Sequence, residues 1–347
     1  MPRRSLVLAG LVLACIAPAA APQSPLSPEL IRSTVESLAD LVHKEYMDAD
    51  VAARVHDLLR RSSEEGRYAS ETAPEALAAS LTKDLVAATS DRHLVVAVVP
   101  QQPAAPASPQ RRDSRADAVR RTNGGIQRLE VLPGNVGYLN VTAFWRPEEA
   151  ADAIATAMRA LRNADALIVD MRANSGGSPE TVALLASYFF DMPALPLFDI
   201  VHRQGPPTRY ATAEPALAER DQRRPVYVLT SPRSFSAGEG FAFLLQERRR
   251  AEVVGTVTAG AANPGQPYRI NDRFEVTIPN GLVRTAIRGR NWEGSGVKPD
   301  VAASDADALR VAHARALRRL IDATRPGDWR DVLQQELRRT DAQNPAR

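Results

Sequence analysis

The segment TSPRSFSAGEG, residues 230–240, predicts a junction between a strand and a helix, around which the rest of the chain is organised. The apolar run at 225–229 before it predicts a buried strand, and the apolar residues at 241–245 after it predict one face of a helix. A passage from strand to helix through small residues exposes one side chain, and the free N–H groups of the helix N-terminus then face an anion. Ser236 stands at this junction, and we predict that it is a nucleophile, although most serines in such turns only cap the helix.

Strands and helices alternate through the segment that contains this turn, from residue 126 to about 302. The pattern predicts strands at 137–141 and 166–170 and helices at 148–161, 179–190 and 306–323. Such alternation is typical of an α/β fold, in which helices pack on a sheet.

The N-terminal part of the chain predicts a helical unit. From about residue 27 to 88, apolar residues recur at helical spacing in three segments. The pattern breaks at 89–92, and His93 leads into an apolar run at 94–99 that predicts a strand. We therefore expect a helical cap domain at 23–99 whose exit turn holds a histidine.

Further segments complete the predicted organisation. Residues 1–22 carry two arginines and then an apolar run too short to cross a bilayer, which is typical of a secretory signal peptide. We expect an exported protein, periplasmic or extracellular. Cys15 is the only cysteine, so no intramolecular disulfide is possible, and a lipoprotein anchor on Cys15 is the alternative. The remaining predicted units are a Pro-rich linker at 100–120, an α/β domain at 121–323 and a charged helical tail at 324–347.

Composition argues against several other functions. The 44 Lys and Arg residues are mixed with 41 Asp and Glu residues, and no basic stripe interleaves with aromatic residues, so we expect no nucleic-acid partner. No segment is apolar over the length of an integral membrane span. The histidines that lack ligand spacing with Asp, Glu or Cys are His43, His56, His202 and His313, and we predict no metal and no cofactor. The oligomeric state stays open.

Four motifs in a fixed order resemble a known family. They are DRHL at 91–94, DMRANSGG at 170–177, SFSAGE at 234–239 and NWEGSGVKPD at 291–300. Together they resemble the tricorn and C-terminal-processing family of serine peptidases. The helical unit resembles the branch that includes interphotoreceptor retinoid-binding protein. The resemblance covers about residues 27–317 and implies a crotonase/ClpP-like α/β catalytic domain that acts on a peptide or an unfolded protein.

The resemblance also implies a role for individual residues. Ser236 matches the nucleophile, His93 the general base and Glu293 the acid that completes the relay, while the N–H groups of Gly177 and Ala237 match the oxyanion donors. The chemistry suits these roles, because a serine hydroxyl needs a base at neutral pH and backbone N–H groups stabilise a developing oxyanion. A histidine at a helix-to-strand turn and an acid in a glycine-rich turn are otherwise typical of structural residues.

The chain departs from the family pattern in three places. The turn at 255–262 has no lysine, so the Ser/Lys mechanism of the C-terminal-processing branch has no base here. Arg92 precedes His93 where the tricorn protease has a serine, and the segment between His93 and Gly137 is too short for a PDZ domain. Because retinoid-binding relatives use the same fold, a non-catalytic carrier of hydrophobic ligands is the alternative function.

Overall fold

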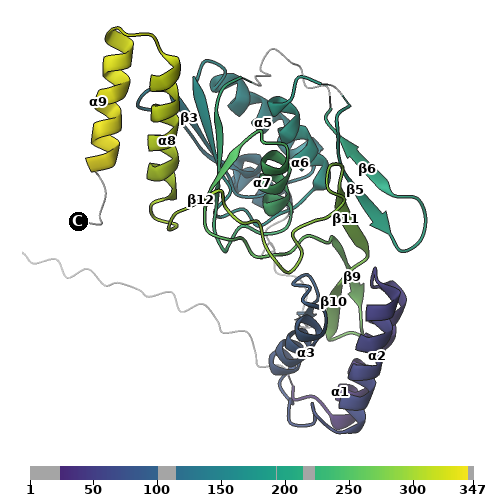
Figure 1. Ribbon diagram of the computed structural model, residues 1–347. Helices are drawn as coiled ribbons and strands as arrows, with labels where there is room; N and C mark the ends of the chain where they lie inside the picture. The colour runs from purple at the N-terminus through teal and green to yellow at the C-terminus, as the bar shows by residue number, and fades with distance from the viewer. Residues whose placement is uncertain (1–23, 101–114, 193, 214–222, 343–347) are drawn as a thin grey trace, which may run out of the picture.

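A six-stranded mixed sheet organises the larger part of the protein, as the computed structural model shows (Figure 1). The structure describes residues 24–100, 115–192, 194–213 and 223–342. The predicted signal peptide with Cys15, and most of the predicted linker, lie outside these residues.

The strand order of this sheet is β12-β8-β7-β4-β3-β2. The strands are β2 (Ile126–Leu132), β3 (Val136–Val141), β4 (Ala166–Asp170), β7 (Val226–Thr230), β8 (Glu252–Gly255) and β12 (Val301–Ala302). All neighbours pair in parallel except β2 and β3, which are antiparallel. The central strands β4 and β7 are buried along their whole length, as expected for parallel strands that are covered on both faces.

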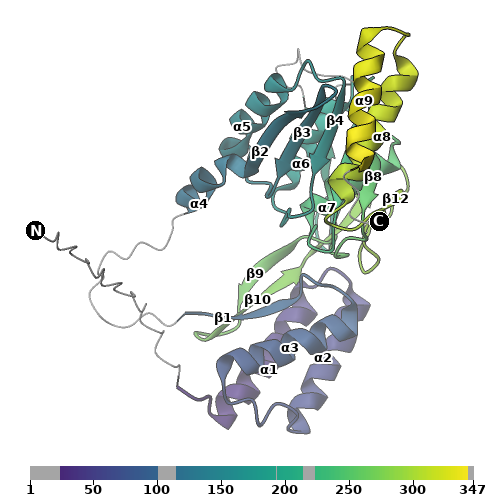
Figure 2. The ribbon, with the colours of Figure 1, turned by 90° about the vertical axis from the view of Figure 1, so that its left-hand side faces the viewer.

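Helices cover both faces of the sheet. One face packs against α5 (Pro147–Ala160), α6 (Pro179–Ala186), the short 3₁₀ turn η2 (Ser187–Phe189) and α7 (Ala237–Glu247). The other face packs against α8 (Ala308–Ala323), which α9 (Asp328–Ala342) covers in turn, so the two helix layers stand on opposite sides in Figure 2. Successive residues of β4 alternate between these layers, since Leu167 and Val169 belong to one core and Ile168 to the other. We call this unit the sheet domain.

A smaller antiparallel sheet flanks the sheet domain, in the order β11-β5-β6. Its strands are β5 (Pro196–His202), β6 (Thr208–Ala211) and β11 (Gly281–Thr285). Side chains of β5 and β11 join the core around α6 and α7, so this sheet forms one wall beside the Ser236 junction.

The N-terminal cap combines helices with a sheet of three strands (Figures 1 and 2). Its elements are α1 (Pro28–Glu45), α2 (Ala49–Glu64), α3 (Pro74–Thr89), β1 (Val95–Val98), β9 (Gly265–Arg269) and β10 (Phe274–Pro279). Phe274, Val276 and Ile278 of β10 are fully buried in the core of the cap. The predicted α/β class with a helical N-terminal cap is confirmed, but the β9–β10 hairpin belongs to the cap, although the sequence places it within the predicted 121–323 domain.

The predicted linker is not irregular to its end. Helix α4 (Arg115–Arg121) and the 3₁₀ turn η1 (Asn123–Gly125) precede β2. Arg115 explains the ordered start of this helix, because it donates two hydrogen bonds of 2.7 Å to the carboxylate of Glu149 on α5 and lies over the ring of Trp145. Residues 115–120 of the predicted linker are therefore helical, and α4 buries none of its residues.

The described part of the chain contains no helix with the length and apolar character that crossing a bilayer requires.

Candidate active site

Ser236 lies at a sharp turn between β7 and α7. Its backbone adopts φ 51° and ψ −119°, which is unfavourable for a residue with a side chain. Two contacts hold the turn: the Ser236 N–H donates to Glu239 Oε2 at 2.8 Å, and the Phe235 N–H donates to the Asn174 carbonyl at 3.0 Å. This strained turn matches the geometry in which α/β enzymes present a nucleophilic serine.

Two glycines bring a bare backbone against this serine. A Cβ atom on Gly176 would lie 2.7 Å from the Cβ of Ser236, and one on Gly177 would lie 2.0 Å from the carbonyl oxygen of Phe144. Both glycines also have positive φ, so no other residue fits without displacing the backbone. Asn174 fixes the loop, since its Oδ1 accepts the Gly176 N–H at 2.8 Å.

Gly177 and Ala237 line the pocket beside Ser236 with backbone N–H groups. Neither donates a hydrogen bond to another described group, and both residues line the cavity next to the Ser236 side chain. Ala237 opens α7, where a helix leaves its first N–H groups without intrahelical acceptors. The two donors are therefore available to a ligand oxygen, as an oxyanion hole requires.

The cap supplies a histidine to the same place. His93 Nε2 lies 3.1 Å from Ser236 Oγ, at hydrogen-bond distance, and its ring packs 4.9 Å from that of Phe235. The turn that carries His93 begins at Ser90, whose left-handed conformation ends α3. Burial lowers the pKa of His93 to about 4, so its imidazole is neutral at pH 7 and able to accept a proton.

Asp91 stands behind this histidine, and the sequence analysis did not select it. Its carboxylate is fully buried, accepts the His93 N–H at 3.0 Å and accepts the Tyr46 hydroxyl at 3.3 Å. Asp91 Oδ1 is also 3.8 Å from His93 Nδ1. Burial raises the pKa of Asp91 to about 6. An acid two residues before a candidate catalytic histidine is the sequence signal that could have identified it.

Glu293 lies in the same cluster but does not reach the histidine by a hydrogen bond. Its Oε2 accepts the N–H groups of Ala262 at 2.7 Å and Asn263 at 3.0 Å, while its Oε1 is buried without a partner. Burial, and then the charge of Asp91, raises the pKa of Glu293 to about 7. One ligand atom from each of Asp91, His93 and Glu293 lies within 4.8 Å of the other two, and a divalent cation there would compete for the imidazole.

A further buried carboxylate, Glu239, connects the serine turn to the turn at 255–262, which has no lysine. Besides Ser236, it accepts the Thr258 hydroxyl and the N–H groups of Gly260 and Ala261, at distances from 2.5 to 3.0 Å. Burial raises the pKa of Glu239, and these donors oppose that rise. The sequence analysis quoted Glu239 within its motif but gave it no role, and the structure places it as a support of the turn.

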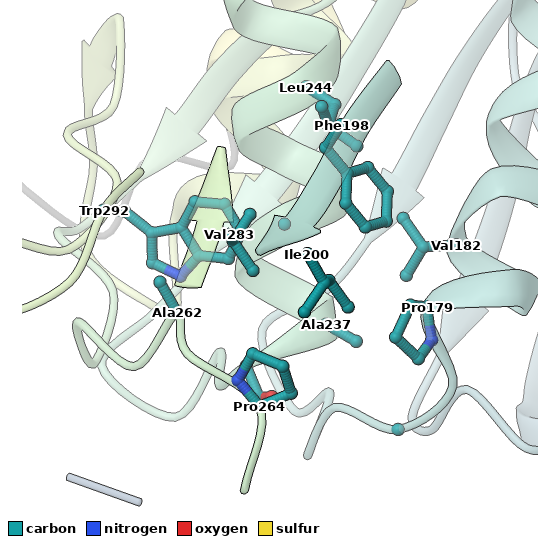
Figure 3. Close-up of a pocket in the computed structure, with 13 residues that line it drawn as sticks. Pro179, Val182, Phe198, Ile200, Ala237, Leu244, Ala262, Pro264, Val283 and Trp292 are labelled. Atoms are coloured by element: carbon teal, nitrogen blue, oxygen red, sulfur yellow. The ribbon is translucent and has the colours of Figure 1, made fainter. Parts of the chain in front are cut away.

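An apolar pocket opens directly beside Ser236 (Figure 3). Figure 3 shows the side chains of β5, β11 and α6 gathered around it, with Trp292 on one flank. Its apolar lining residues are Pro179, Val182, Phe198, Ile200, Ala237, Leu244, Ala262, Pro264, Val283 and Trp292. A more polar groove shares Gly177, Pro179, Ile200 and Pro264 with this pocket and continues it along the surface. The site can therefore receive an apolar side chain beside the serine and an extended chain across it.

Two family models match most of the described chain. The model of peptidase family S41 matches residues 135–303, and the model of the N-terminal domain of Peptidase_S41 in eukaryotic IRBP matches residues 28–128. The carboxy-terminal processing protease CtpB of Bacillus subtilis is 27% identical over 176 residues, which are 50% of this chain and 35% of that protein. The chain thus spans about a third of the length of this relative.

Solved structures share the fold. A lipoprotein from Streptococcus agalactiae superposes with a TM-score of 0.55 at 13% identity, over 89% of this chain and all of that one. The tricorn protease superposes with a TM-score of 0.52 at 13% identity, over 90% of this chain and 37% of that one.

Proposed function

Because this chain belongs to peptidase family S41, we propose that it is a serine-type peptidase that cleaves peptide bonds through an acyl-enzyme on Ser236, with His93 as general base. The observation that carries the proposal is the 3.1 Å distance between His93 Nε2 and Ser236 Oγ. A proton acceptor at hydrogen-bond distance is what a serine hydroxyl needs to become a nucleophile at neutral pH.

The reaction follows from the placement of these groups. Ser236 Oγ attacks the scissile carbonyl carbon while its proton passes to His93 Nε2. The carbonyl oxygen becomes an oxyanion, which the N–H groups of Gly177 and Ala237 bind. The C–N bond then breaks as Nε2 returns the proton to the leaving amine, and a water molecule, deprotonated by the same nitrogen, hydrolyses the acyl-enzyme.

Glu293 completes the proposed site as an acid that helps to orient the relay. Two observations support this role. Glu293 lies in the cluster with Asp91 and His93, and its buried Oε1 accepts no hydrogen bond from another group. Its two backbone hydrogen bonds fix the carboxyl group, so it acts in place and does not take up the serine proton.

The pocket beside Ser236 supports a substrate with an apolar side chain at the scissile bond. The substrate is a peptide or an unfolded protein, and the side chain that precedes the scissile bond enters the apolar pocket. Burying an apolar side chain there contributes about 1.5–3 kcal/mol, whereas a charged side chain would lose its hydration without an ionic partner. Among the residues that the structure describes, none of those lining this pocket is charged.

The cap supplies the base and the sheet domain supplies the nucleophile, so the two units act as one site.

The protein is exported to the periplasm or the extracellular space, a proposal that rests on the signal-peptide pattern at 1–22. A lipid anchor on Cys15, which would hold the protein at the membrane surface, is the alternative.

Hydrolysis of peptides by Ser236→Ala tests the proposal. The full chain is assayed on unfolded protein and on fluorogenic peptides with apolar residues before the scissile bond, and Ser236→Ala should reduce turnover to background. Ser70→Ala is the matched control, because Ser70 is exposed between α2 and α3, lines neither the pocket nor the groove, and should leave turnover unchanged. Absence of hydrolysis in the wild-type chain, together with binding of an apolar ligand in the pocket, would instead support the non-catalytic carrier.

A further inference from the structure

The end of helix α1 reaches into the candidate active site from the cap. Tyr46 follows the last residue of α1, is 3% exposed, and donates its hydroxyl to Asp91 Oδ2 at 3.3 Å. The other oxygen of Asp91 accepts the backbone N–H of His93 at 3.0 Å. Asp91 is thus held from one side by the cap helix and from the other by the turn that carries the histidine.

The proposed reaction requires an acceptor at the far nitrogen of His93. When Nε2 accepts the serine proton, the neutral ring carries its own proton on Nδ1, and both nitrogens are protonated after the transfer. Nδ1 is buried and makes no hydrogen bond in this structure. Asp91 Oδ1, 3.8 Å away, needs a shift of less than 1 Å to accept that proton, and such contacts commonly tighten when the substrate binds.

We propose that Asp91, held by the Tyr46 hydroxyl, is the positioning carboxylate for His93. This inference rests on the proposed peptidase function. It assigns to a residue of the histidine turn the part that a buried aspartate plays in other serine hydrolases, which is to hold the tautomer and stabilise the imidazolium. Tyr46, Asp91 and His93 all belong to the cap, so the cap carries the base together with its support.

The neighbours of Asp91 favour it over Glu293 as the ionised group. The titratable groups that face Asp91 are His93 on its own turn, Tyr46 from α1 and Glu293 from the opposite turn. Two buried carboxylates this close do not both ionise readily, and the pKa of Glu293, raised to about 7, is above that of Asp91, raised to about 6. Both oxygens of Asp91 accept a hydrogen bond, whereas Glu293 Oε1 has no donor, so the charge resides on Asp91.

The cap contains a second tyrosine–aspartate pair that serves as a control. Tyr68 is also 3% exposed and donates its hydroxyl to Asp84 Oδ2 at 2.7 Å. This pair lies within the cap, where Arg67 also binds Asp84, and it is not part of the cluster around His93. Tyr68→Phe therefore removes the same kind of hydrogen bond as Tyr46→Phe without touching the site.

Steady-state kinetics of the full chain test the inference. Asp91→Asn retains an acceptor for the His93 N–H but removes the charge, and it should lower kcat by about 10²-fold or more with little change in KM. Tyr46→Phe should lower kcat by about 3- to 10-fold, which is the loss expected for one hydrogen bond. Tyr68→Phe should leave kcat unchanged, even if its melting temperature falls as far as that of Tyr46→Phe.

The pH profile supplies a readout that a purely structural role would not move. The positioning carboxylate must be ionised, so kcat/KM of the wild type should rise through about pH 6, where Asp91 titrates, and not near pH 4, where His93 does. Asp91→Asn should lose this acid limb, while Glu293→Gln should keep it. Suppose that the wild type is active and that Asp91→Asn has the same kcat and the same acid limb of its pH profile. This result would overturn the inference and leave the peptidase assignment standing.

Discussion

His93 Nε2 and Ser236 Oγ lie 3.1 Å apart although 143 residues separate them in the sequence. The histidine comes from a turn of the cap and the serine from the junction of β7 and α7. The contact therefore depends on how the cap sits on the sheet domain. The β9–β10 hairpin joins the two, because it pairs with β1 in the cap and continues directly into β11.

Arg203 is a further link between the two units, and its loss should weaken the site. It lies on the loop between β5 and β6, and its Nη1 donates to the carbonyls of His43, Lys44 and Tyr46 at the end of α1. Arg203→Ala should lower kcat by several-fold and the free energy of unfolding by about 1–2 kcal/mol. Steady-state kinetics measure kcat, and chemical denaturation measures the free energy of unfolding. Arg209, exposed in β6 of the same hairpin, is the control, and Arg209→Ala should change neither quantity.

The apolar pocket should set the size of the side chain before the scissile bond. Val182 is buried in its wall, so Val182→Phe fills part of the space. The ratio of kcat/KM for a peptide with leucine at that position to one with alanine should fall by about 10-fold, since a pocket discriminates by about 1–3 kcal/mol per methylene-sized change. Because the ratio compares two substrates of one variant, general loss of stability does not affect it. An unchanged ratio would place the specificity pocket elsewhere.

Stability should respond to pH through Glu293. Its pKa is raised from 4.5 to about 7 in the folded chain, first by burial and then by Asp91. Between these values the folded state holds a proton that the unfolded state has lost, so this group lowers the stability as the pH rises through the window. Glu293→Gln cannot ionise, and its melting temperature relative to the wild type should be higher at pH 8 than at pH 5. Glu64→Gln, an exposed change on α2, should show no such difference.

Removal of metal ions should leave the activity unchanged. In the proposed reaction the proton moves between Ser236 and His93, which Asp91 positions, and backbone N–H groups bind the oxyanion. A cation held by Asp91, His93 and Glu293 would instead draw the imidazole into coordination. Dialysis against EDTA should therefore preserve kcat or raise it. A loss of activity that zinc restores would show that the cluster holds a functional ion.

The sequence predicted those parts of the fold that local patterns define. β7 and α7 are adjacent in the chain, so the change of period from strand to helix marks the serine junction directly. The helix expected at 179–190 is real only to Ala186, after which η2 follows. The pairing of β1 with β10 joins Val95 to Thr277, and no local pattern carries such a contact. The small sheet of β5, β6 and β11 was missed for the same reason.

Some residues of the candidate site could be predicted from local motifs, and others could not. Motifs brought Ser236, His93, Glu293, Gly177 and Ala237 to attention, and the structure places all five around one cavity or its adjoining cluster. Asp91 and Tyr46 were missed as parts of the site because burial and their mutual contact define them, and 45 positions separate them in the sequence.

If His93 activates Ser236, the rate of covalent labelling of the serine depends on the histidine. A fluorophosphonate should modify the wild-type chain on Ser236, with loss of fluoride, and peptide mass spectrometry identifies the site. His93→Gln keeps a polar side chain but removes the base, and it should label at least about 10²-fold more slowly at pH 7.5. Labelling of His93→Gln at the wild-type rate, or stoichiometric labelling of Ser236→Ala, would contradict the account.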